Sequence, residues 1–170
     1  MNDIVNRVER SGIVSFNLEE YYPQGERVVF DLKPFLFQEM ILREKDFRHA
    51  LKELDWSQYE GKYVAISNSV DAIVPTWAYM LVMTYLVPVA KEAVIGGLDE
   101  LERYLMMKVL DEIDPSDFQG KFVVVKGCSK YPVPLQAYGE VVKLLFGTAR
   151  SIMFGEPCST VPLWKEKQLK

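Results

Sequence analysis

Two cysteines are the residues of this sequence with the most distinctive chemistry. Cys128 and Cys158 are the only cysteines among the 170 residues. Each stands in a polar stretch with glycine or proline, residues 127–130 and 155–158, and such loops are where functional residues concentrate. Two thiols can bind a metal ion, form a reversible disulfide or simply pack in a core. The sequence leaves all three open.

A metal site would need more ligands than these two thiols. Structural zinc takes four protein ligands, so Asp71, Glu156 or a second chain would have to complete the set. Cysteine thiolates also hold iron–sulfur clusters, and a homodimer would supply four of them. We therefore predict Cys128, Cys158 and Asp71 as metal ligands, with zinc or iron as the metal.

Nucleophilic catalysis by a cysteine or serine with a histidine base is not expected from this sequence. His49 is the only histidine, and it lies off the apolar stripe of its predicted helix, so we expect it in solvent. A cysteine–histidine dyad or a serine-hydrolase triad is then not expected. A thiol here would be activated by Lys130 or by a helix end. The glycine patterns of dinucleotide and P-loop sites are absent, and the sequence does not decide whether the protein is an enzyme.

An internal repeat organises the chain around these residues. Residues 42–100 align without a gap with residues 101–159, so that Asp55-Trp56-Ser57 recurs as Asp114-Pro115-Ser116. A fixed offset of this kind predicts a duplicated structural unit. We expect a single domain over residues 1–170, in which residues 1–41 form N-terminal strands and a connection, and residues 160–170 form a tail.

Strands and helices alternate in both copies, which predicts an α/β fold. We expect helices at Glu44–Leu54 and Leu98–Ile113 and helices that begin at Pro75 and Pro134. The predicted core strands are Lys62–Ser67, Ala93–Gly96, Lys121–Lys126 and Ser151–Phe154. Such alternation predicts one mostly parallel, three-layer sheet, with the first and third strands in the middle. Gly12–Leu18 and Arg27–Leu32 are predicted as extra N-terminal strands, and Trp164 as an anchor of the tail.

The repeat also predicts where a ligand would bind. In open parallel sheets, ligands bind beyond the carboxyl ends of the strands where the strand order reverses. The loops after the first and third core strands would face one crevice there, and two helix amino ends would favour an anion or a thiolate. The copies differ at these loops: Ser69 aligns with Cys128, Asp71 with Lys130, and Asp99 with Cys158. The predicted ligand-binding residues are Ser67, Asn68, Ser69, Asp71, Ser129, Lys130, Ser159 and Thr160.

Charge and hydropathy exclude several partners. The net charge is −4 with both signs interspersed, so we expect neither nucleic acid nor an anionic membrane as a partner. Residues 72–90 are uncharged, but Pro75 and Pro88 interrupt them and the second copy carries charges, so we reject a membrane span. The N-terminus lacks the apolar core of a signal peptide, which favours the cytoplasm, where thiols stay reduced.

Three longer strings of the chain carry a family resemblance. They are residues 71–79 (DAIVPTWAY), 126–129 (KGCS) and 151–163 (SIMFGEPCSTVPL). With them the chain resembles domain of unknown function 2480 over nearly its whole length. The resemblance brings no established activity. It implies gene neighbourhood with iron–sulfur cluster assembly, and hence iron–sulfur assembly proteins as partners.

Two hypotheses follow. In the first, Cys128 and Cys158 are metal ligands or a redox pair, Asp71 is a third ligand or proton acceptor, and Lys130 favours the thiolate; the protein then has an accessory role in iron–sulfur or metal handling. In the alternative, the protein is a non-catalytic module that binds a small anion or a protein partner, and its cysteines are only packed.

Overall fold

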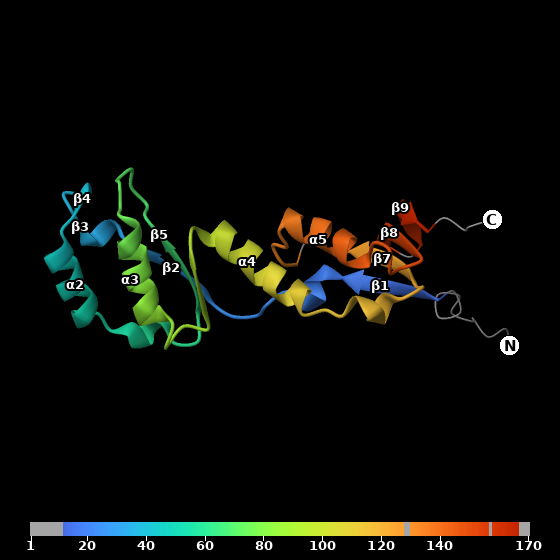
Figure 1. The fold of residues 1–170 in the computed structure, drawn as a ribbon, viewed down its shortest axis with the longest axis horizontal. Coiled ribbons are helices and arrows are strands. Elements are labelled where there is room, and N and C mark those ends of the chain that lie inside the picture. The colour runs from blue at the N-terminus through green and yellow to red at the C-terminus, as the bar shows by residue number, and fades with distance from the viewer. Residues whose placement is uncertain (1–11, 128–129, 157, 167–170) are drawn as a thin grey trace. The chain divides into compact units, whose positions relative to one another are not determined.

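The computed structural model describes residues 12–127, 130–156 and 158–166, which Figure 1 traces from the N-terminus to the C-terminus. The chain forms two compact units. Unit B comprises Gln24–Tyr104, and unit A comprises Met1–Pro23 together with Leu105–Lys170. The boundary falls within helix α4 (Leu98–Asp111), so this helix contributes to both units.

Unit B contains a three-stranded parallel sheet, called sheet B here. Its strand order is β2 (Arg27–Asp31), β5 (Tyr63–Ser67), β6 (Glu92–Ile95). The connecting elements are the 3-10 helix η2 (Lys33–Phe35), the hairpin of β3 (Leu36–Phe37) and β4 (Ile41–Leu42), α2 (Glu44–Glu53), the 3-10 helix η3 (Trp56–Tyr59) and α3 (Thr76–Leu86). Each strand of this sheet is added on the outer side of the strand that precedes it in the chain, so the strand order does not reverse.

The core of unit B lies between the sheet and two helices. Val64 and Ile66 of β5 point to the same face because side chains alternate along a strand. They belong to one buried cluster with Leu51 of α2 and Val82 of α3. Both helices cover one face, as expected when two right-handed crossovers advance in the same direction. On the other face, Arg27 of β2 pairs with Glu102 of α4 at 2.8 Å.

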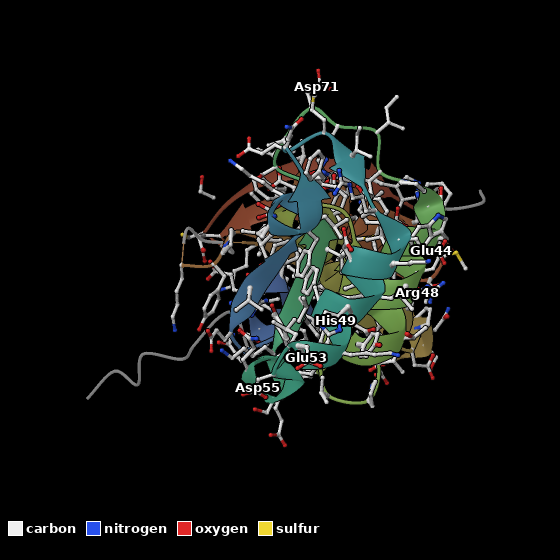
Figure 2. All side chains as sticks on the ribbon, turned by 90° about the vertical axis from the view of Figure 1, so that its left-hand side faces the viewer. Glu44, Arg48, His49, Glu53, Asp55 and Asp71 are labelled. Carbon is white, nitrogen blue, oxygen red and sulfur yellow. The ribbon has the colours of Figure 1, made fainter. Side chains whose placement is uncertain are left out.

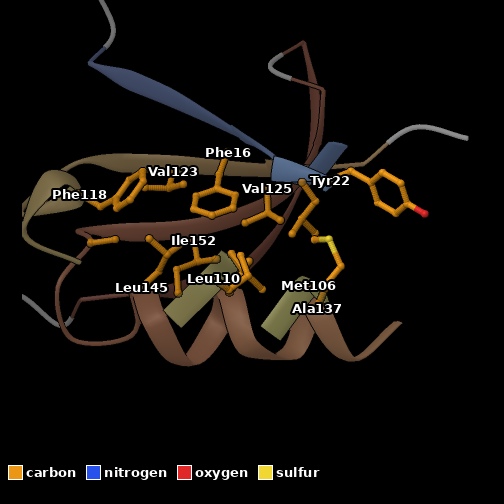
Figure 3. Packing of buried hydrophobic residues seen from close by; sticks show 13 residues of the cluster. Phe16, Tyr22, Met106, Leu110, Phe118, Val123, Val125, Ala137, Leu145 and Ile152 are labelled. Atoms are coloured by element: carbon orange, nitrogen blue, oxygen red, sulfur yellow. The ribbon is translucent and has the colours of Figure 1, made fainter. Parts of the chain in front are cut away.

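Unit A has the same parallel arrangement with one strand added. Sheet A has the order β1 (Ile13–Asn17), β7 (Phe122–Lys126), β8 (Ser151–Glu156), β9 (Ser159–Lys165), with β9 antiparallel to β8. The other elements of unit A are the 3-10 helix η1 (Leu18–Tyr21), the carboxyl half of α4, the 3-10 helix η4 (Pro115–Phe118) and α5 (Leu135–Leu145). Figure 3 shows Val125 and Ile152 of the sheet packed over Ala137 and Leu145 of α5.

The strand registers of the two sheets correspond residue by residue. Tyr63 lies opposite Glu92 in sheet B, and Phe122 lies opposite Ser151 in sheet A; the second pair lies 59 residues after the first. The turn before each middle strand is capped alike, since Asp55 accepts from the Ser57 amide and Asp114 from the Ser116 amide. Both middle strands therefore enter their sheets through the same local structure.

The α/β class and the mostly parallel pairing are confirmed, and so are all four predicted core strands. The prediction of one sheet with the first and third core strands in its middle is wrong, because β5 and β7 belong to different sheets. The N-terminal strands explain the difference. β1 pairs with β7 and β2 pairs with β5, so each takes up an edge of a middle strand. They are core strands rather than additions to a complete sheet.

The tail forms a strand instead of an irregular extension. β9 pairs with β8 along its length, and the Trp164 ring lies 4.9 Å from that of Phe146, which confirms the predicted anchor. The helices within the described residues are all too short or too polar to cross a membrane.

Candidate functional site

The loop after β5 is tied to the end of the neighbouring strand β2. Asp31 and Ser67, the last residues of these two strands, lie opposite each other. The Asp31 carboxylate accepts hydrogen bonds from the Ser69 hydroxyl at 2.5 Å and from the Ser69 amide at 3.0 Å. The predicted ligand-binding residue Ser69 therefore binds the carboxylate of Asp31, which no sequence pattern had singled out.

Asp31 is ionised in this arrangement. Burial raises the pKa of the Asp31 carboxyl, but hydrogen bonds from Ser69 and from the Lys33 amide, together with the charge of Lys33, outweigh it. The net result is a pKa below the ordinary value for aspartate. A carboxylate fixed by such donors acts as a clamp on the loop, because hydrogen bonds to a charged group are stronger than neutral ones.

Asn68 gives the loop its internal shape. Its side-chain amide donates to the backbone oxygens of Val70 at 2.8 Å and Ala72 at 3.3 Å. Asp71 is exposed at the same loop. Ser67, Asn68, Ser69 and Asp71 thus lie at the carboxyl end of β5 in sheet B.

No histidine accompanies this loop. Figure 2 shows Asp71 at one end of unit B and Asp55 at the other, with His49 on α2 between Glu44, Arg48 and Glu53. His49 is exposed, which confirms that it lies in solvent. A histidine-based catalytic dyad at this loop is therefore excluded.

The carboxyl end of sheet A carries the second set of predicted residues. Lys126 ends β7 and pairs with Glu156 at the end of β8, at 3.6 Å. Cys158 follows in the turn to β9 and is exposed, so the alternative in which the cysteines are packed is wrong for this residue. Cys128 and Ser129 lie outside the described residues. The exposed Lys130 lies beyond them on the loop after β7.

A glutamate holds the loop that follows β7. Glu19 accepts hydrogen bonds from the amides of Lys130 at 2.7 Å and Tyr131 at 3.2 Å. The Tyr131 ring also stacks on Tyr22, with centroids 4.8 Å apart. Sequence reasoning missed Glu19 because it is more than a hundred residues away along the chain. The only available signal was its place just beyond β1, which matches that of Lys33 beyond β2.

Tyr138 is a second residue that sequence reasoning did not assign to this loop. A side-chain carbon at Gly127 would collide with the Tyr138 hydroxyl, so the absence of a side chain at position 127 lets the phenol from α5 reach the end of β7. The equivalent position in unit B is Asn68. The Tyr138 hydroxyl therefore lies beside Gly127, at the start of the loop after β7.

Ser159 and Thr160 differ from their prediction as loop residues. Both belong to β9, and the Thr160 hydroxyl lies 3.8 Å from the Met153 sulfur across the hairpin. The hairpin depends on Gly155, whose φ is +122° and whose added Cβ would lie 2.6 Å from the Ser159 carbonyl oxygen.

Those predicted residues that the structure describes thus fall into two groups, one at each sheet. The single crevice expected between the loops after β5 and β7 depended on one sheet whose strand order reverses, and the two loops belong to different sheets. Within the described part of the chain, no three histidine, cysteine or acidic side chains gather as a metal site would require.

The fold and these loops define the class of protein. It is an α/β protein with a parallel sheet and a mostly parallel sheet, each carrying polar loops at the carboxyl ends of its parallel strands. The chain matches the family described as "Protein of unknown function (DUF2480)" over residues 2–166 and belongs to it, which confirms the resemblance. A search of the curated proteins and a search of the solved structures found no match.

Proposed function

We propose that the protein carries a redox-active thiol pair, Cys128 and Cys158, at the carboxyl end of sheet A. The observation that carries the proposal is the pairing of β7 with β8. They are neighbouring parallel strands, and Cys158 follows β8 as an exposed residue. Cys128 is the second residue after the end of β7 in the sequence, and β7 and β8 end at the same edge of one sheet.

The spacing of such strands suits a disulfide. Neighbouring strands lie about 4.8 Å apart, and the Cα atoms of bridged cysteines lie about 4.4 to 6.8 Å apart. With glutathione disulfide as the oxidant, the two thiols would give one protein disulfide and two glutathione thiols. Two electrons and two protons pass to the oxidant.

The nearby charges of sheet A also support thiol chemistry. Lys126 and Lys130 flank the position of Cys128 in the sequence, and positive charge favours a thiolate. The proposal uses groups of unit A alone and gives no role to Asp71, which belongs to unit B. A reversible thiol pair is compatible with the cytoplasm, where thiols are kept reduced and disulfides are transient.

A metal ion is the second candidate use of the same thiols. Zinc or iron would find two thiolates and, at the end of β8, the Glu156 carboxylate, which already pairs with Lys126. Three donors do not complete a closed tetrahedral site in one chain. We therefore assign the redox pair to the single chain, and a shared metal to an assembly of two chains.

The test is oxidation of the full chain with glutathione disulfide, followed by mass spectrometry of the intact protein and of its peptides. We expect one linkage between Cys128 and Cys158 in the wild type. The Cys128→Ser and Cys158→Ser variants should each form a mixed disulfide with glutathione instead. Ser159→Ala, next to Cys158, is the matched control and should behave as the wild type.

Metal content of protein purified without chelator separates the two uses. Zinc or iron at one ion per two chains, lost in both cysteine variants, would assign the thiols to metal binding in a dimer. Metal-free protein whose thiols form only mixed disulfides would overturn the proposal.

We also propose that residues 42–100 and 101–159 are two copies of one structural unit within a single domain. The matched registers of β5 with β6 and of β7 with β8 support it. An equivalent backbone hydrogen bond before each middle strand also supports it: the Gly61 amide donates to the Val89 carbonyl oxygen, and the Gly120 amide donates to the Thr148 carbonyl oxygen. The thiols are then specific to the second copy.

A further inference from the structure

The outer edge of β6 differs from the matching edge of sheet A. Within the described residues, β6 pairs only with β5 and ends sheet B. In sheet A, β8 occupies the matching place and carries the antiparallel strand β9 on its outer side. An uncovered strand edge presents backbone donors and acceptors that another strand can bind.

The backbone of β6 is oriented for such pairing. The Gly96 amide donates to the Ile66 carbonyl oxygen of β5 at 2.9 Å. Since backbone groups alternate in direction along a strand, the N–H and C=O groups of Ala93 and Ile95 point away from β5. The corresponding residues of β8, Ile152 and Phe154, lie opposite residues of β9.

In sheet A, Trp164 of β9 packs over the corresponding outer edge of β8. It lies opposite Ile152 on β8 and against Phe146 at the end of α5. Under it, Ile152 is fully buried and Ala149 is 2% exposed. The tryptophan thus covers the gap between the end of a helix and the edge of the sheet.

In unit B the matching gap is a pocket of about 110 Å³. Its apolar lining is Met83, Leu86, Val87, Ala90 and Ala93. These residues stand 59 positions before Val142, Leu145, Phe146, Ala149 and Ile152. Ala90 and Ala93 remain partly exposed, and Val87 is 70% exposed. An aromatic side chain placed in this pocket would contact the residues of unit B that correspond to those beneath Trp164 in unit A.

We propose that the edge of β6 binds an extended segment of a partner protein, antiparallel to β6, with an aromatic side chain in this pocket. The pairing in sheet A defines the segment. Val161, three residues before Trp164, lies opposite Phe154, whose counterpart is the exposed Ile95. Lys165 lies opposite Ser151, whose counterpart is Glu92. The segment therefore carries an aliphatic residue, an aromatic residue three positions later, and then a basic residue.

Within the described residues, no segment of the chain pairs with the outer edge of β6. β9 is already paired with β8, and residues 1–11 and 167–170 contain no aromatic residue. Pairing of β6 with β6 of a second copy would leave the pocket unfilled, because Glu92–Ile95 is also without an aromatic residue. A partner protein that adds a strand, as in β-augmentation, is the occupant that fits both the edge and the pocket.

The probe is a fluorescent, blocked peptide with the sequence of residues 159–166, measured by fluorescence anisotropy against the full chain. We expect saturable binding that weakens at least tenfold when the tryptophan of the peptide is replaced by serine. Ala93→Glu, which puts a charge in the pocket, should weaken it as much. Ile73→Glu is the matched control, since Ile73 is 94% exposed on the loop after β5, and should bind as the wild type.

Amide hydrogen exchange at Ala93 and Ile95 completes the test. Both amides should exchange rapidly in the protein alone and slow when the peptide is added. Equal binding by Ala93→Glu, or no binding by the wild type, would overturn the proposal. Slow exchange of these amides without peptide would also overturn it. If light scattering then shows a dimer, the edge of β6 pairs with a second copy; if it shows a monomer, the edge pairs with another segment of this chain.

Discussion

Single carboxylates hold the loops at the carboxyl ends of both sheets. Asp31 binds the amide and hydroxyl of Ser69, and Glu19 binds the amides of Lys130 and Tyr131. Each carboxylate comes from the first strand of its unit or the turn after it and reaches the loop after the middle strand. The described parts of these two loops are thus held by residues that lie outside residues 42–159.

Replacing Asp31 by asparagine should destabilise the protein by about 1 to 2 kcal/mol at pH 7, the lower part of the range for hydrogen bonds to charged groups, because Asp31 is partly exposed. The pKa of Asp31 is lowered on folding, so its stabilisation is complete above the unfolded-state pKa of about 3.9 and is lost as the pH falls through the folded-state pKa. Urea unfolding should show the difference between wild type and Asp31→Asn narrowing from pH 5 to pH 3.

Asp71→Asn is the control for this prediction, because Asp71 is exposed on the same loop. We expect it to change the free energy of unfolding by less than about 0.5 kcal/mol, as surface substitutions usually do. A loss at pH 7 that is equal for the two variants would show that Asp31 does not clamp Ser69.

At the scale of elements, the sequence predicts the strands and helices well and the sheets poorly. Runs such as Tyr63–Ser67 and Phe122–Lys126 are strands because their β-branched residues are buried on both faces. Their partners could not be predicted, because a strand buried on both faces carries no alternation that marks a neighbour. The pairing of β1 with β7 joins residues more than a hundred positions apart.

The hairpin of β8 and β9 was missed for a related reason. Pro162 within the tail argues against a strand, and it is accommodated beside an irregularity in register between Ile152 and Met153. Of the site residues, those on loops after strands were predictable from the carboxyl-end rule. Glu19 and Asp31 were not, because no local pattern links them to the loops they bind.

Gly155→Ala should destabilise the protein by about 2 kcal/mol or more, since residue 155 combines a positive φ with a backbone contact that cannot move aside. Gly139→Ala, in the middle of α5 with open space around it, is the matched control. It should stabilise the protein by about 0.5 to 1 kcal/mol through helix propensity. Thermal unfolding of the two variants checks the contrast, and a stabilising Gly155→Ala would contradict the assigned hairpin geometry.

At the scale of the whole molecule, the chain builds two separate hydrophobic cores. One cluster contains Leu51 and Val64, and the other contains Leu145 and Val123. Among the residues that the structure describes, none belongs to both buried clusters. Only α4 belongs to both units. The proposed thiol pair and the proposed binding edge of β6 thus belong to units with different cores.

Matched leucine-to-alanine substitutions should therefore act locally. Leu51 and Leu145 are both fully buried, and truncation of either should cost about 2 to 5 kcal/mol. Native-state amide exchange should show Leu51→Ala lowering the protection of Val64 more than that of Val123, and Leu145→Ala doing the reverse, because cooperative units open separately. Equal losses in β5 and β7 for both variants would mean that the two cores unfold as one. In that event, a variant that destabilises sheet B would also impair formation of the proposed disulfide at sheet A.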